Sequence, residues 1–170
     1  MDIVVCVKTN PDLQMVRVKD RVAQTEAVPY KIGDLEKNAL EAAVVLREAG
    51  AAGKVTALCL AEGNRKAAED IKVALAMGAD EAVVIDDPAL AEPDQAAVAA
   101  ALAAAVQKIG SCDLLLFGEG STDNYTGQVG ARVAELLGLP QIGYARKVEV
   151  AGDAVRCERS IDDMLETIDA

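Results

Sequence analysis

The residues best suited to chemistry lie in one glycine-rich segment, 118–130, which reads GEGSTDNYTGQVG. Four of its thirteen residues are glycine, and glycine lets a backbone approach a ligand closely. The segment leads into a helical pattern, so the free N–H groups and positive end of a helix face it and favour an anion such as phosphate. We expect the ligand-binding residues to be Gly118, Gly120, Ser121, Thr122, Asp123, Asn124, Thr126, Gly127, Gln128 and Val129.

The spacing of this segment leaves a second interpretation open, because it matches neither the Walker loop nor the GxGxxG fingerprint. In this interpretation the segment is a long strand–helix turn that needs its glycines and Asp123 for its own conformation. Asp123 then caps the turn instead of contacting ligand hydroxyls. Glu119 puts a negative charge near the proposed anion, and it either points outward or pairs with Lys8.

Side-chain catalysis is not expected. The chain contains no histidine, which excludes His-dependent triads, HExxH zinc sites and imidazole acid–base chemistry. No GxSxG motif occurs, so the serines lack a nucleophile-elbow context. We therefore predict no catalytic and no metal-binding residue, and any redox chemistry would have to reside on a cofactor.

The amino-acid composition of the chain limits the kinds of partner that it could bind. A net charge of −11 and an aromatic content of 2% argue against nucleic acid, which needs a cationic face and stacking side chains. The longest apolar stretch, 96–106, is about half a membrane span, so no membrane insertion is expected. Four cysteines without CxxC spacing indicate buried, reduced thiols. A cytoplasmic location follows as an expectation, since the first predicted strand begins at once and leaves no room for a leader.

Around the glycine-rich segment, apolar runs of four to six residues alternate with helical patterns. The runs at 3–7, 55–60, 82–85 and 114–117 predict strands. Helices are expected at 34–49, with a polar start and Gly50 as its stop, and at 64–78, 94–110 and from 129 onward. The residues expected to face inward on the second and last helices include Ala68, Ile71, Leu75, Val133 and Leu136.

This alternation predicts an α/β fold, a Rossmann-like doubly wound parallel sheet. Two regions interrupt it. Residues 8–33 form a long insertion with a small hairpin near 15–18, and residues 147–157 form an antiparallel hairpin. We therefore expect a single nucleotide-binding domain over 1–170, with a parallel-sheet core at 1–145 and an antiparallel hairpin extension at 146–170.

Several separate motifs give the chain a family likeness. They are IVVCVK at 3–8, ALAMGAD at 74–80, Asp123 with GQVG at 127–130, AELLGLPQ at 134–141, and LET at 165–167. In these motifs and their order the sequence resembles the beta subunit of electron-transfer flavoproteins along its entire length.

The resemblance implies a fold of the adenine-nucleotide-binding type shared with universal stress proteins. It implies a heterodimer with an FAD-carrying alpha subunit that shuttles electrons from acyl-CoA or other dehydrogenases to an acceptor. The beta subunit itself would bind AMP or a second FAD. Besides the glycine-rich segment, the family's binding positions fall on Cys6, Lys8, Gly33, Asp34, Leu35, Glu36 and Leu60. The family's C-terminal arm is absent from these 170 residues.

Two other interpretations of function stay open. One is a stand-alone adenine-nucleotide sensor resembling universal stress proteins, which also place a glycine-rich loop after the fourth strand. The other is a degenerate subunit that docks its partner and holds no ligand.

Overall fold

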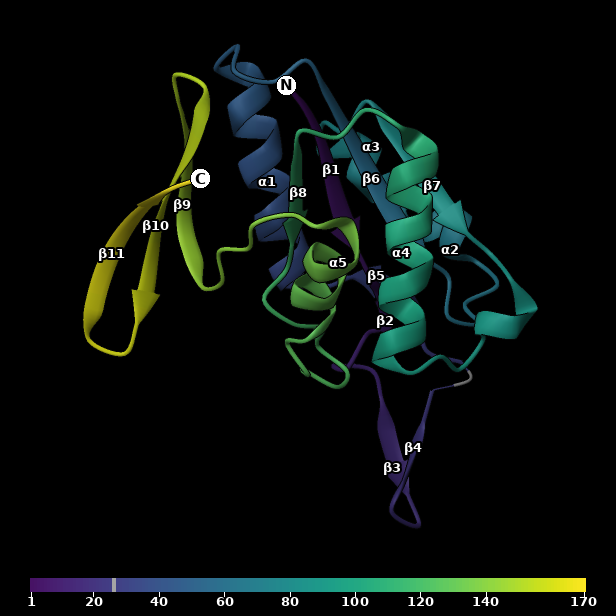
Figure 1. Ribbon diagram of the computed structural model, residues 1–170. Helices are drawn as coiled ribbons and strands as arrows, with labels where there is room; N and C mark the ends of the chain where they lie inside the picture. Colours follow the sequence, from purple (N-terminus) through teal and green to yellow (C-terminus); the bar gives the residue numbers. More distant parts are fainter. Residues whose placement is uncertain (26) are drawn as a thin grey trace.

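A parallel sheet of four strands forms the centre of the computed structural model, which describes residues 1–25 and 27–170 (Figure 1). The strands are β1 (Asp2–Val7), β6 (Lys54–Leu60), β7 (Glu81–Ile85) and β8 (Leu114–Phe117), in the order β7-β6-β1-β8. The four predicted strands are thus confirmed, each to within one residue. The chain builds outward from β1 to β7 and then returns to the other side of β1, so strand order reverses between β1 and β8.

Helices cover both faces of the sheet because β1 alternates its side chains between them (Figure 1). Ile3, Val5 and Val7 belong to the core beneath α1 (Asp34–Glu48) and α3 (Lys72–Ala76), joined by Ile71, which follows α2 (Ala67–Asp70). Val4 and Cys6 belong to the opposite core, beneath α4 (Gln95–Ile109) and α5 (Val129–Leu137). The Rossmann-like doubly wound prediction is confirmed.

Helix boundaries follow local capping chemistry. Asp94 precedes α4 and its side chain accepts a hydrogen bond from the N–H of Ala97 at 2.8 Å, which satisfies one free donor of the first turn. Gly110 ends the same helix with a φ of +87°, a conformation that L side chains rarely adopt. A short 3-10 helix, η1 (Pro88–Leu90), lies between β7 and α4.

The prediction of one continuous helix over 64–78 is wrong. It is divided at Ile71 into α2 and α3, and its buried face consists of Ala67, Ile71 and Ala74. Ala68 and Leu75, which were expected inside, are exposed because the buried positions begin one residue earlier. Leu136 was also expected inside and is 56% exposed, since α5 lies at the open edge of the sheet beside β8.

The insertion that follows β1 consists of two strand pairs. β2 (Thr9–Pro11) pairs with β5 (Tyr30–Ile32), and β3 (Arg17–Lys19) pairs with β4 (Val22–Gln24) in a hairpin that projects from the body (Figure 1). The hairpin begins two residues later than predicted, because its turn is at Asp20 and Arg21, with φ values of 51° and 65°. Glu26, which falls within the predicted insertion, lies outside the described residues.

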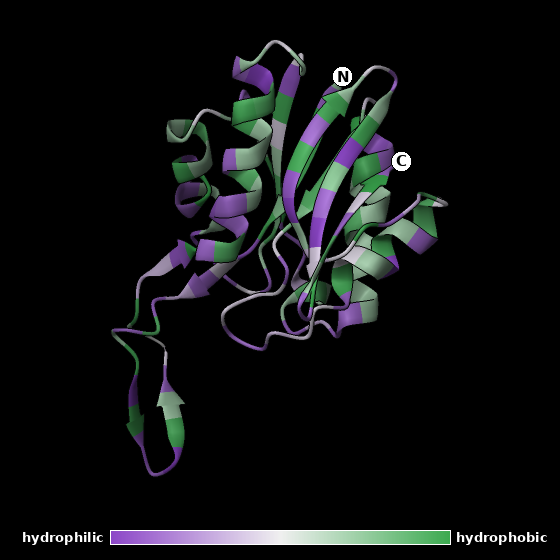
Figure 2. Cartoon of the chain, turned by 90° about the vertical axis from the view of Figure 1, so that its left-hand side faces the viewer, coloured by the Kyte–Doolittle hydropathy of each residue, from purple (hydrophilic) through white to green (hydrophobic). Residues whose placement is uncertain are grey.

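The C-terminal extension is a three-stranded antiparallel sheet instead of the expected hairpin. Its strands are β9 (Ala145–Ala151), β10 (Ala154–Ile161) and β11 (Met164–Asp169), in the order β11-β10-β9. The third strand forms because Asp162 adopts a φ of 49° and turns the chain back. Polar and apolar residues alternate along these strands (Figure 2). Among the described residues, no helix has both the length and the apolar character needed to cross a bilayer.

Candidate functional site

A cleft lies at the carboxyl ends of β1 and β8, where the strand order reverses and where open α/β sheets hold ligands. It contains about 750 Å³ of space, including space open to solvent. The structure brings most of the predicted site residues together around it. These are Cys6, Lys8, Glu36, Leu60, Gly118, Gly120, Ser121, Asn124, Thr126, Gly127, Gln128 and Val129.

The remaining predicted site residues lie outside the lining. Asp123 is bonded to Lys8, which lines the cleft, and Gly33 and Leu35 pack against Glu36 and Gly118 respectively. Asp34 is exposed and pairs with Lys37 at 3.0 Å, and Thr122 is exposed.

Several lining residues were not predicted as site residues. Three apolar ones, Val98, Leu102 and Phe117, were expected only as parts of helices or strands. Glu62 was missed although it follows β6 directly, and the rule that ligands lie at the carboxyl ends of strands is a signal that would have found it. The residues that complete the lining are Val7, Pro93, Gln95, Glu119 and Gly130.

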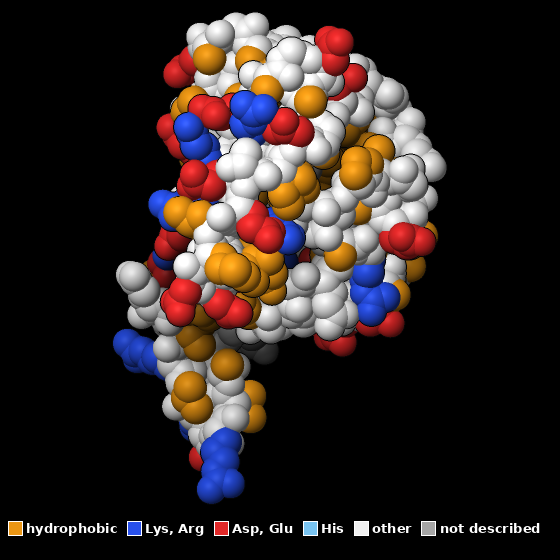
Figure 3. Space-filling view, turned by 60° about the vertical axis from the view of Figure 1, so that its left-hand side comes forward, with side chains coloured by type: hydrophobic (Ala, Val, Ile, Leu, Met, Phe, Trp, Pro, Cys, Tyr) orange, Lys and Arg blue, Asp and Glu red, His pale blue; other side chains and the backbone are white. Residues whose placement is uncertain are grey.

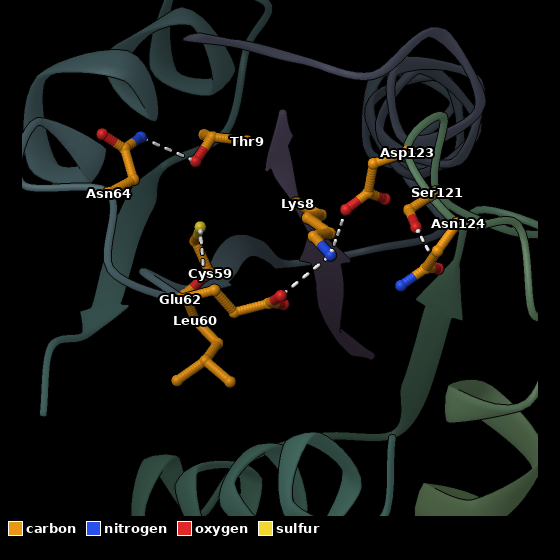
Figure 4. Close-up of polar contacts among 9 residues, drawn as sticks. All are labelled: Lys8, Thr9, Cys59, Leu60, Glu62, Asn64, Ser121, Asp123 and Asn124. Atoms are coloured by element: carbon orange, nitrogen blue, oxygen red, sulfur yellow. Dashed lines mark hydrogen bonds and ion pairs between the residues drawn. The ribbon is translucent and has the colours of Figure 1, made fainter. Parts of the chain in front are cut away.

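Lys8 follows the carboxyl end of β1 and lies between two carboxylates (Figure 4). Its Nζ lies 2.8 Å from Oε2 of Glu62 and 2.9 Å from Oδ2 of Asp123. Burial disfavours the ammonium charge, but the hydrogen bonds to both carboxylates outweigh it and raise the pKa of Lys8. Burial likewise opposes the charge of Asp123, yet hydrogen bonds from Ser121 and Lys8 lower its pKa overall. Lys8 and Asp123 therefore keep their charges at neutral pH.

The expected alternative of a pair between Glu119 and Lys8 is wrong. Oε1 of Glu119 accepts a hydrogen bond from the hydroxyl of Tyr125 at 2.8 Å, and that hydrogen bond raises the pKa of Tyr125. The carboxylates paired with Lys8 are instead those of Glu62 and Asp123. Ser121 completes the loop with a 3.1 Å hydrogen bond to Oδ1 of Asn124 (Figure 4).

Acidic groups outnumber basic ones around the cleft. Among the described residues that line it, Glu36, Glu62 and Glu119 are acidic, and Lys8 is basic and already paired. A phosphate placed here would therefore depend on the backbone N–H groups at the start of α5. The N–H of Arg132 is bonded to the carbonyl of Gln128 at 3.1 Å, which leaves the N–H groups of the preceding turn free of helical partners.

Gly118 is needed for packing within the protein. A Cβ at this position would lie 3.0 Å from the backbone N of Glu36 and 3.0 Å from the carbonyl carbon of Leu35. The end of β8 therefore approaches the first turn of α1 too closely for any side chain. This contact fixes Glu36 against the floor of the cleft.

Glu36 is a buried carboxylate, with 4% of its surface exposed. Its Oε2 atom has no hydrogen-bond partner among the described residues. Burial raises the pKa of this carboxyl above the ordinary value for glutamate. Gly33 makes room for it, since a Cβ there would lie 2.1 Å from Oε2.

The cysteines are free thiols, and Cys6, Cys59 and Cys157 are buried. Burial raises the pKa of Cys6 well above its ordinary value and that of Cys59 to about 11. Both thiols are therefore protonated at neutral pH, so Cys6 contributes to the cleft wall as an apolar group and not as a nucleophile.

The sheet and cleft place the chain in the Rossmann-like α/β class. The family described as "Electron transfer flavoprotein domain" matches residues 20–170. With nearly nine-tenths of its residues inside that match, the chain belongs to the electron transfer flavoprotein family, and its relatives there are beta subunits.

Three relatives illustrate the similarity. The chain is 42% identical to the electron transfer flavoprotein subunit beta of Thermoanaerobacterium thermosaccharolyticum and 40% identical to that of Clostridium acetobutylicum. It is 33% identical to the caffeyl-CoA reductase-Etf complex subunit CarD of Acetobacterium woodii. Each comparison covers 99% of this chain and 64% of the relative, so the chain spans less than two thirds of their length.

Proposed function

We propose that this chain is an electron-carrier subunit, the beta half of an electron transfer flavoprotein, and that its cleft binds an adenine nucleotide, AMP or FAD. The observation that carries the proposal is the position of the cleft, at the point of strand reversal and against the glycine-rich loop, in a member of this family. The redox chemistry would reside on flavin, which accepts and donates electrons when bound, so we propose no enzymatic activity for the chain alone.

The residues present fit a nucleoside that carries phosphate at one end. Leu60, Val98 and Phe117 offer an apolar wall for a planar base. The free N–H groups at the start of α5, beside Gln128 and Val129, offer donors for a phosphate. Ser121, Asn124 and Thr126 line the cleft between these regions and can bond ribose hydroxyls.

The same cleft disfavours a high density of negative charge away from α5, because Glu36, Glu62 and Glu119 line it. This acidic surplus supports the competing possibility of a degenerate subunit that docks its partner without a ligand. The two possibilities differ in what the purified protein retains.

The partner of the carrier would be an FAD-containing alpha subunit, and dehydrogenases such as acyl-CoA dehydrogenases would be reached through that complex. The projecting β3–β4 hairpin supports such a contact. Val18 and Val22 on it are 72% and 59% exposed, and Met15 beside it is 56% exposed. Figure 3 shows apolar side chains along the projecting hairpin and basic side chains near its tip. Within the complex we propose that residues 8–33 face the flavin of the alpha subunit.

We also propose a cytoplasmic location, because the cysteines are free thiols and the cytoplasm keeps thiols reduced.

Identification of the retained ligand tests the nucleotide proposal. The protein is purified without added nucleotide and denatured, and any released compound is identified by absorbance and mass. Released AMP or FAD supports the carrier subunit. Released ATP would indicate a sensor, and no released compound, together with no uptake of added AMP or FAD, would favour the degenerate subunit.

A variant in the loop locates the site. The Cβ of a residue at Gly120 would lie 3.2 Å from the ring of Tyr125, an exposed side chain that can move away. Gly120→Val should therefore keep the sheet folded, as judged by circular dichroism, while its methyl groups obstruct the cleft and abolish nucleotide retention. Retention equal to that of the wild type would show that the loop has been assigned wrongly.

A further inference from the structure

Glu62 lines the cleft in a backbone conformation that glutamate rarely adopts. It follows the last strand residue of β6 but one and has a φ of +46°, in the left-handed region that favours glycine. Gly63 continues the turn with a φ of +77°, and the N–H of Asn64 closes it with a 2.8 Å hydrogen bond to the carbonyl of Ala61. Residues in such unfavourable conformations gather at functional sites, so the position of this side chain needs an explanation.

The surrounding hydrogen bonds hold the turn next to the segment that carries Lys8. The buried Asn64 donates from Nδ2 to Oγ1 of Thr9 at 3.0 Å, and Thr9 is the residue after Lys8. On the other side, the N–H of Ala61 donates to the carbonyl of Ile85 at 2.9 Å. The turn therefore presents the Glu62 carboxylate to Lys8, where Oε2 lies 2.8 Å from Nζ (Figure 4).

This contact neutralises the cation before any ligand arrives. The Lys8 ammonium group also bonds Asp123 at 2.9 Å, so one positive charge faces two carboxylates. The three groups together carry a surplus of negative charge, and two of the three donors of the ammonium group are already used. Lys8 lines the same cleft as Gln128 and Val129, where the N–H groups of α5 begin. Without Glu62, the cation would be available to a phosphate in that cleft.

We propose that Glu62 is a specificity-determining residue that selects ligands by charge, because it withholds Lys8 from the phosphates of a nucleotide. This inference rests on the proposed nucleotide-binding function and names which ligands of that class the cleft prefers. A like charge placed beside a ligand disfavours it, so each added phosphate should cost affinity in the wild type. The cleft should therefore tolerate a nucleoside monophosphate better than a diphosphate.

The test measures binding of adenosine, AMP and ADP to the wild type and to Glu62→Gln by calorimetry at one ionic strength. Glutamine keeps the shape of the side chain and an oxygen that can accept from Lys8, so the turn should stay folded, as checked by thermal unfolding. Removal of the charge should tighten AMP binding about five- to twentyfold and ADP binding by a larger factor. Adenosine, which has no phosphate, should change by less than about twofold.

Glu119→Gln is the matched control. It removes an equal charge from the lining of the cleft, and its amide oxygen can still accept from the hydroxyl of Tyr125. Lys8 stays paired with both of its carboxylates in this variant. We therefore expect AMP binding to tighten by no more than about threefold.

The possible results separate this inference from the proposed function. Unchanged AMP binding in Glu62→Gln, an equal gain for adenosine, or an equal gain in Glu119→Gln would each overturn the role of Glu62 while the nucleotide site stands. AMP binding by Glu62→Gln together with no binding by the wild type would support the role of Glu62 and identify the wild type as a subunit that holds no ligand. If adenosine, AMP and ADP bind neither protein, the inference is overturned, and failure of FAD to bind as well would remove the proposed nucleotide site.

Discussion

The ammonium group of Lys8 lies 2.9 Å from the Oδ2 atom of Asp123, although the two residues are 115 positions apart in the sequence. Lys8 follows β1, and Asp123 lies in the loop between β8 and α5. Glu62, which follows β6, bonds the same ammonium group. One cation thus connects the segments that follow three adjacent strands of the sheet, at the edge where the cleft lies.

Replacement of this cation should destabilise the protein. Lys8→Met leaves Glu62 and Asp123 facing each other without a counter-charge, and we expect the free energy of unfolding to fall by about 1–2 kcal/mol at pH 7, measured by urea denaturation. Lys8→Arg, which keeps the charge, serves as the control.

The pKa of Asp123 is lowered from 3.8 in the folded protein, so the stability that its charge contributes is present above that value and is lost as pH falls through the folded pKa. The difference between wild type and Lys8→Met should therefore shrink below about pH 3.8. Equal stability at pH 7 would contradict the role of the pair.

The contact between β8 and α1 makes Gly118 intolerant of a side chain. Gly118→Ala places a Cβ 3.0 Å from backbone atoms of Leu35 and Glu36, which cannot rotate away, so we expect a loss of about 1–3 kcal/mol in unfolding free energy. Gly143→Ala is the matched control, because there the added Cβ would lie 3.2 Å from the flexible side chain of Gln141 and φ is not positive. The melting temperature and the urea unfolding free energy of Gly118→Ala should be clearly lower than those of Gly143→Ala. Similar losses in both would disprove the steric explanation.

The buried carboxylate of Glu36 predicts a dependence of stability on pH. Burial raises the folded pKa of this carboxyl above the ordinary 4.5. Below pH 4.5 the carboxyl is therefore protonated in both the folded and the unfolded state, and it does not destabilise the folded state. The destabilisation develops as pH rises from the unfolded pKa through the folded pKa. In the ligand-free protein, Glu36→Gln should therefore be stabilising by about 1–2 kcal/mol at pH 8 and close to neutral at pH 4. Unfolding curves at both pH values check this, and an effect independent of pH would show that the carboxyl ionises as freely as in water.

The projecting hairpin predicts a surface for the partner. Val18 is 72% exposed, so Val18→Asp should change the unfolding free energy by less than about 0.5 kcal/mol, yet it should weaken binding to a purified alpha subunit at least tenfold. Val73→Asp, at a valine of α3 that is 46% exposed, controls for the added charge. Binding is measured by surface plasmon resonance. Undiminished affinity of Val18→Asp would place the partner elsewhere.

The sequence predicted the parallel core well because its signals are local. The apolar runs at 3–7 and 114–117 and the caps at Asp94 and Gly110 act within a few residues, and the structure reproduces them. The buried face of α2 and α3 was misassigned because the helix is divided at Ile71, and no glycine or proline in the sequence marks this division. The third strand of the C-terminal sheet was missed because it depends on a left-handed Asp162, a conformation that aspartate adopts only in some contexts.

The candidate site was predictable as a segment but not as a set of contacts. Its loop is visible in the glycine spacing, and the position of Glu36 could be expected only from the family resemblance. That Glu62, and not Glu119, pairs with Lys8 depends on how β1, β6 and β8 are ordered in the sheet, which no local pattern encodes.

The alternation of side chains along β1 has a mechanical consequence. Ile3 and Val5 anchor one helical layer while Val4 and Cys6 anchor the other, and the other strands of the sheet alternate in the same way, so the two layers share the sheet as their common wall. Neither layer can open without withdrawing support from its opposite, and the two halves of the parallel-sheet unit are bound to melt together as one cooperative block.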